Sequence, residues 1–139
     1  TLGTPKFDKN TVAWIIERSS RFVLFTKIPS LKYTVDAFKT SLNKFPSAKK
    51  SITLDNWAEN SRFKELKLAT YFCHPYSSWE KWAIEHAFKR LRRFIPKKHK
   101  LSLYSFNDIK HFEHIMNHTP RKCLQWKTPF EVFNQSLTK

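Results

Sequence analysis

Apolar residues near the start of the chain come in two short runs rich in β-branched and aromatic side chains. Val, Ile, Thr and Trp fill residues 11–17, and Val, Phe and Ile fill residues 22–28. Such residues favour strands. We therefore predict three antiparallel strands in meander order, the first only partly present. Two further short strands are predicted at residues 51–54 and 69–73.

Helical spacing of apolar residues alternates with these strands and dominates the second half of the chain. Ser77 and Glu80 have the spacing of a capping box, as do Thr128 and Glu131. Pro96 is placed to end the helix that begins near Ser77. The predicted helices cover residues 34–43, 58–66 and 77–94, with one more capped by Ser105 and another by Thr128. This order predicts an α/β fold in a single domain, with a central mixed sheet of three antiparallel and two shorter strands, flanked by helices.

Charge changes the picture of what the chain binds. The 139 residues include 26 Lys and Arg but only 11 Asp and Glu, so the net charge is +15. A polyanion is the expected partner, and nucleic acid is the commonest one. The basic residues recur along the whole chain, which makes a membrane-surface protein the weaker interpretation.

The sequence lacks the features that several other classes of protein require. Residues 12–16 form the longest apolar run, far short of the roughly 18 residues that a membrane span needs. Two cysteines do not make a disulfide framework, which fits a reducing, cytoplasmic compartment. No phosphate-binding glycine loop or serine-hydrolase motif is present.

Acidic residues are scarce, so the positions of two of them are informative. Asp55 follows a predicted strand, and Glu85 lies in the helix predicted from Ser77. Two carboxylates at one sheet edge could hold divalent cations for phosphodiester chemistry. The alternative is structural: Asp55 would cap the next segment, and Glu85 would pair with Lys81 or Lys89 on its own helix.

Basic residues and histidines surround this region of the sequence. Seven cations and no acid lie between Glu85 and Asp108, which suits either a phosphate-binding surface or a solvated basic face: Lys89, Arg90, Arg92, Arg93, Lys97, Lys98 and Lys100. Three histidines share one predicted helix, and we interpret them as surface residues rather than zinc ligands: His111, His114 and His118.

Five segments in order resemble a known family. They are residues 15–22, 53–56, 71–79 (Tyr-Phe-Cys-His-Pro-Tyr-Ser-Ser-Trp), Glu85 and residues 117–133. Together they resemble the catalytic core of DDE transposases of the insertion-sequence-thirty type, which are relatives of retroviral integrases. The resemblance covers nearly the whole chain and implies an RNase H-like fold.

The resemblance also implies roles for individual residues. Asp55 corresponds to the second catalytic Asp of the family and Glu85 to its catalytic Glu. Both would bind Mg²⁺ or Mn²⁺ for cleavage and transfer of DNA strands. DNA, as transposon ends and target, is the expected partner, with self-association on DNA and no membrane partner. The residues expected to contact DNA are Asn56, Lys81, Lys89, Arg92 and Arg93.

The chain departs from the family pattern in three ways. The first catalytic Asp falls at or before Thr1, and the upstream helix-turn-helix region is absent from this chain, so we expect the chain alone to be inactive.

The third departure is that Trp57 and Trp82 stand where the family has glycine, and the chain has one glycine in all. We hypothesise that UGA codons read as glycine were translated as Trp; UGG codons at both positions would refute this. The remaining alternatives are a decayed transposase fragment and a non-catalytic basic nucleic-acid-binding module.

Overall fold

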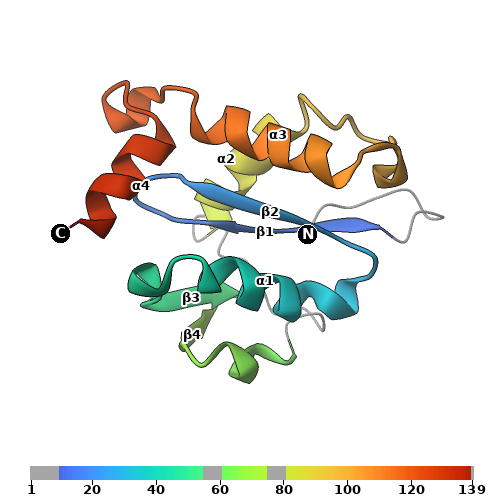
Figure 1. Ribbon diagram of the computed structural model, residues 1–139, viewed down its shortest axis with the longest axis horizontal. Helices are drawn as coiled ribbons and strands as arrows, with labels where there is room; N and C mark the ends of the chain where they lie inside the picture. The colour runs from blue at the N-terminus through green and yellow to red at the C-terminus, as the bar shows by residue number, and fades with distance from the viewer. Residues whose placement is uncertain (1–9, 55–60, 75–80, 139) are drawn as a thin grey trace.

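The computed structural model describes residues 10–54, 61–74 and 81–138. In these residues the chain forms four α-helices and two small sheets, so the predicted mixed α/β class is confirmed. A two-stranded hairpin crosses the middle of the molecule, with α2 and α3 on one side and α1 with the second sheet on the other (Figure 1).

The hairpin joins β1 (Thr11–Ile16) to β2 (Val23–Ile28), and both strands lie where the sequence predicts them. The strands are antiparallel, with Ile16 opposite Val23 and Thr11 opposite Ile28. The hairpin is buried on both faces, because Val12 and Phe25 belong to one apolar cluster and Ala13 and Ile28 to another.

The second sheet pairs β3 (Ser51–Leu54) with β4 (Ala69–Phe72) in parallel. The prediction of one central mixed sheet is therefore wrong for the described residues, which form two separate sheets of two strands. A cavity lined by side chains of both β1 and β3 lies between the sheets, so no ladder of hydrogen bonds joins these two strands. The predicted first strand of the meander lies outside the described residues.

The four α-helices are α1 (Thr34–Asn43), α2 (Trp82–Leu91), α3 (Phe106–Asn117) and α4 (Pro129–Leu137). Ser105 and Thr128 cap α3 and α4 through the complete capping boxes that their sequences predict. The predicted box at residues 77–80 lies outside the described residues.

Two helical predictions need correction. α2 ends at Leu91, before the predicted end near residue 94. After Leu91 the chain continues in tighter turns, in which the Arg93 N–H donates to the Arg90 carbonyl and the Phe94 N–H to the Leu91 carbonyl. Pro96, which has no N–H to continue a helix, follows these turns. The described part of the helix predicted at 58–66 is a short 3-10 turn at Phe63–Leu66, which ends at a left-handed Lys67.

Side chains of α3 close the outer edge of β2. Asn117 accepts a hydrogen bond from the Val23 N–H and donates one to the Val23 carbonyl, both at 2.8 Å. Glu113 accepts from the Phe25 N–H at 2.6 Å, and Lys110 donates to the Phe25 carbonyl at 2.7 Å. These three side chains occupy the positions of a neighbouring strand, so β2 presents no open edge there.

Candidate functional site

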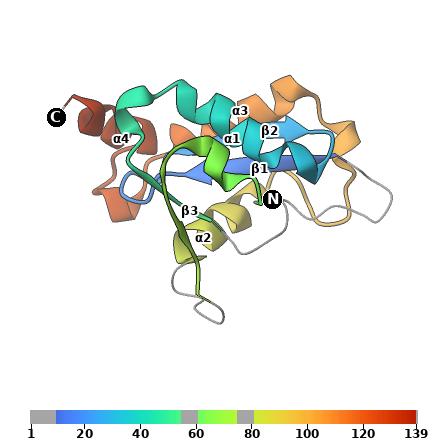
Figure 2. The same cartoon turned by 90° about the horizontal axis from the view of Figure 1, so that it is seen from below.

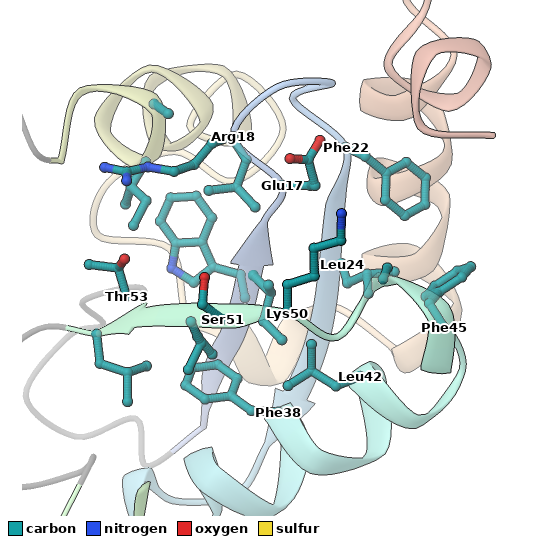
Figure 3. A pocket seen from close by; sticks show the side chains of 18 of the residues that line it. Glu17, Arg18, Phe22, Leu24, Phe38, Leu42, Phe45, Lys50, Ser51 and Thr53 are labelled. Carbon is teal, nitrogen blue, oxygen red and sulfur yellow. The ribbon is translucent and has the colours of Figure 1, made fainter. Parts of the chain in front are cut away.

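A cavity of about 400 Å³ lies between the two sheets (Figure 3). Its wall is mostly apolar and includes Trp14 of β1, Phe38 of α1 and Phe133 of α4. Polar side chains border it as well, among them Glu17 and Lys50. The cavity thus gathers residues from segments that are far apart in the sequence.

The end of β3 and the beginning of α2 meet at this cavity. Leu54, the last residue of β3, and Ile84, in the first turn of α2, both line it. Seen from below, α2 and β3 overlap (Figure 2), while Figure 1 places them on opposite sides of the hairpin. Asp55 follows Leu54 directly and, like Asn56, lies outside the described residues. Glu85 follows Ile84 directly, so the residues that precede the two predicted carboxylates border one space.

Glu85 is exposed in the first turn of α2. In the described part of the chain it forms no ion pair, so the alternative pairing with Lys81 or Lys89 is not made there. A carboxylate at this end of a helix is favourably placed relative to the helix dipole. Because the Glu85 side chain is exposed, its carboxylate oxygens are accessible to a ligand.

The donor chemistry of Glu85 suits a hard cation such as Mg²⁺, which prefers carboxylate oxygens. A complete site needs more than one such ligand. Among the described residues, no group of three or more His, Cys, Asp or Glu side chains could hold a metal ion. A cation at Glu85 would thus depend on ligands from elsewhere, and Asp55 is the candidate that the sequence supplies.

The turn between β1 and β2 is organised around the Glu17 carboxylate. It accepts hydrogen bonds from the backbone N–H groups of Ser19 and Ser20, at 2.9 and 2.7 Å, and from the Ser20 hydroxyl. Burial alone would raise the pKa of Glu17, but these hydrogen bonds outweigh burial and hold the pKa below its usual value. These hydrogen bonds to Glu17 hold the turn in place at one side of the cavity.

Arg21 connects this turn to the start of α2. Its guanidinium carbon lies 5.1 Å from the centre of the Trp82 ring, and His86 packs against the same ring at 4.3 Å. Sequence analysis missed this cluster. The spacing of Trp82 and His86 on one helix face could have indicated their contact, but nothing local indicates Arg21.

Trp82 fits the structure without the backbone freedom of glycine. It is the first residue of α2, and it is not among the residues with positive φ. The backbone at position 82 therefore does not require glycine. Trp57 lies outside the described residues, and the codon hypothesis stays a prediction about the gene.

The predicted DNA-contacting residues of α2 and its C-terminal end differ in exposure. Lys89 and Arg93 are exposed, and Lys81 is half-buried. Arg92 packs over the Phe88 ring at 4.8 Å, and burial lowers its pKa. Lys97, Lys98 and Lys100 continue the exposed basic surface. Phosphate binding is thus open to Lys89 and Arg93 more directly than to Arg92.

Several known proteins are similar to this chain in sequence. No protein-family model matches the chain. It is 32% identical to the transposase for insertion sequence element IS1086 of Cupriavidus metallidurans, over 94% of this chain and 40% of that protein. It is 33% identical to the transposase for IS4351 of Bacteroides fragilis, over 96% of this chain and 43% of that protein.

A third relative is transposase InsI for insertion sequence element IS30A of Escherichia coli, 29% identical over 91% of this chain and 35% of that protein. The chain is related to insertion-sequence transposases of the IS30 type. The resemblance given by the five sequence segments is thereby confirmed. The chain spans about two fifths of the length of these transposases.

Within the described residues, none of the helices is both long and apolar enough to cross a membrane.

Proposed function

We propose that this chain forms part of the catalytic core of a transposase, in which Asp55 and Glu85 hold Mg²⁺ or Mn²⁺ and the basic residues around α2 hold DNA. The main support is the cavity lined by both Leu54 and Ile84, since each directly precedes one of the two carboxylates. Similarity to IS30-type transposases supports the choice of DNA as substrate.

Residues at different positions would have different roles in the proposed site. Glu85 and Asp55 would supply carboxylate oxygens to the metal, and Lys89 and Arg93 would contact phosphates beside it. When bound, the metal would activate an attacking oxygen and stabilise a leaving one. Arg21 and Trp82 would position the first turn of α2, and with it Glu85.

The proposal is tested by metal binding to the DNA-bound chain, measured with Mn²⁺ by electron paramagnetic resonance. We expect Asp55→Asn and Glu85→Gln each to weaken Mn²⁺ binding by more than the roughly 10–100-fold that is typical when an outer-shell partner is lost. DNA affinity in a chelating buffer should change little. Glu65→Gln, which alters an exposed carboxylate next to Arg62, is the matched control and should leave Mn²⁺ binding unchanged.

Unchanged Mn²⁺ binding in both variants would favour the second candidate, a basic nucleic-acid-binding module without catalysis. That candidate is favoured by the net charge of +15 alone. The resemblance places a further catalytic Asp at or before Thr1, so we expect the 139-residue chain not to cut DNA by itself. Nicking by this chain that Asp55→Asn abolishes would contradict that expectation.

A further inference from the structure

The connection between α3 and α4 holds a tryptophan out in solvent. Trp126 is 69% exposed, although indole rings are usually packed in a core. Its backbone is left-handed, with φ of 66°, and so is that of Gln125, with φ of 55°. A bulky residue in this conformation is a backbone outlier, and such outliers cluster at functional sites.

Hydrogen bonds keep this connection in its strained form. The Arg121 N–H donates to the Lys127 carbonyl at 3.0 Å, and the Trp126 N–H donates back to the Arg121 carbonyl at 2.9 Å. Arg121 itself is buried and donates from Nη2 to the Met116 carbonyl at the end of α3. The backbone is thus anchored, while the Trp126 ring contributes little to packing.

The surroundings of Trp126 are basic and aromatic. Lys127 follows it directly and Lys122 lies four residues before it, both exposed, and no acidic residue occurs between Glu113 and Glu131 in the sequence. Glu131 is engaged, because it accepts hydrogen bonds from the backbone N–H and the hydroxyl of Thr128. Hydrogen bonds from Thr128 and the nearby charges of Lys127 and His118 lower the pKa of Glu131, so this carboxylate offsets part of the positive charge. Two lysines against one carboxylate still leave the surface with a surplus of positive charge.

Further rings are exposed at the same junction of α3 and α4, at one end of the molecule (Figure 1). His118 stacks on His114 at 4.0 Å and on Phe130 at 4.7 Å, measured between ring centres. All three side chains are exposed. The junction thus presents stacked rings as well as the isolated indole.

We propose that this surface, made of Trp126, Lys122, Lys127, His118 and Phe130, binds single-stranded DNA, with the Trp126 ring stacked on an unpaired base. Aromatic rings stack on nucleobases of any sequence, and lysines neutralise the phosphates beside them. The faces of bases within a duplex are already covered by their neighbours, so the ring selects an unpaired base. A protein partner fits less well, because the centres of protein interfaces are depleted of lysine.

This surface includes neither Glu85 nor Asp55, and its test needs no metal. The 139-residue chain is titrated against a fluorescein-labelled 20-nucleotide single strand and the corresponding duplex, in a chelating buffer. We expect Trp126→Leu to weaken single-strand binding about tenfold and duplex binding less than twofold. Trp126→Phe, which keeps a ring, should restore most of the affinity. The matched control is Tyr71→Leu, which removes another exposed ring, 61% accessible, and should have no effect.

Several results would overturn the proposal. Single-strand affinity that is unchanged in Trp126→Leu excludes stacking by this ring. An equal loss for single strand and duplex, or loss of a dimer in sedimentation, would assign the ring to a different role.

If Trp126→Leu does not fold, as judged by circular dichroism, the double variant Lys122→Gln, Lys127→Gln takes its place. It should weaken single-strand binding and flatten its salt dependence, and an unchanged salt dependence would refute the proposal. Because Glu85→Gln should leave single-strand binding intact, failure here is distinguishable from failure of the metal site.

Discussion

At the scale of single residues, the scarcity of glycine has a measurable structural consequence. Five residues of the described chain have left-handed backbones, and none is glycine: Arg21, Lys67, Lys98, Gln125 and Trp126. A side chain at Cβ makes this conformation costly, by roughly 1–2 kcal/mol for each residue. The protein therefore carries backbone strain at positions where glycine would relieve it.

Lys98 offers a direct test of this strain, because it is exposed and has φ of 73°. We expect Lys98→Gly to raise the free energy of unfolding by about 0.5–1 kcal/mol, since relief of the Cβ clash exceeds the extra entropy of the unfolded chain. Urea denaturation measures the difference. Lys97→Gly removes the same charge at a residue without positive φ and should destabilise; stabilisation by both variants would refute the explanation.

Glu17 leads to a prediction about pH. Its pKa is lowered in the folded protein, so its ionised form stabilises the fold. That stability is present above the ordinary pKa of 4.5 and is lost as the pH falls through the folded value. We expect Glu17→Gln to destabilise the protein at pH 7 and to differ much less from the parent near pH 3.

Urea denaturation at the two pH values measures this difference. Glu65→Gln is the control, because its carboxylate is exposed and its ion pair with Arg62 contributes little. A destabilisation by Glu17→Gln that stays the same at both pH values would show that the carboxylate charge is not what holds the turn.

At the scale of secondary-structure elements, the contact of α3 with β2 decides how the hairpin sheet is bounded. Three side chains of the helix supply the hydrogen bonds that a further strand would make to β2. An open strand edge would invite pairing with other chains. The helix thus limits any extension of this sheet to the β1 side, which faces the cavity.

Asn117 is the residue through which this contact is best tested, because it is buried and bonds both polar groups of Val23. We expect Asn117→Ala to lower the free energy of unfolding by about 2–4 kcal/mol, since two backbone groups lose their partners. Thermal or urea unfolding measures the loss. Asn107→Ala, at an exposed position of α3, should cost far less; equal losses would contradict the edge-closing role.

At the scale of the whole molecule, a net charge of +15 would govern the proposed encounter with DNA. Neutralisation of phosphates releases counterions, so log affinity falls by about 0.9 for each phosphate contact per log unit of salt. The exposed basic residues around α2 and the α3–α4 surface both contribute to this charge. Binding to any DNA is therefore expected to be steeply salt-sensitive.

The expected salt dependence is measured with a 20-base-pair duplex between 50 and 200 mM NaCl, a range over which salt screening changes strongly. The double variant Lys89→Gln, Arg93→Gln should reduce the slope by about 1.8, for two lost phosphate contacts. Lys39→Gln, Lys44→Gln on and just after α1 removes the same charge elsewhere and should change the slope less. An affinity of the parent chain that does not vary with salt would exclude phosphate contacts as the basis of binding.

The sequence by itself determined the elements and their caps. The hairpin strands and the capping boxes at Ser105 and Thr128 depend on neighbouring residues, whose side chains and backbone preferences act within a few positions. The relationship to transposases also followed from ordered motifs, as did the choice of Asp55 and Glu85.

Only the tertiary structure decided which of these elements meet. Asn117 bonds Val23, 94 positions away in the sequence, and Arg21 lies over Trp82, with 60 residues between them. The division into two sheets and the cavity shared by Leu54 and Ile84 arise in the same way. Such contacts depend on how all the apolar faces pack at once, and no local preference of the backbone encodes them.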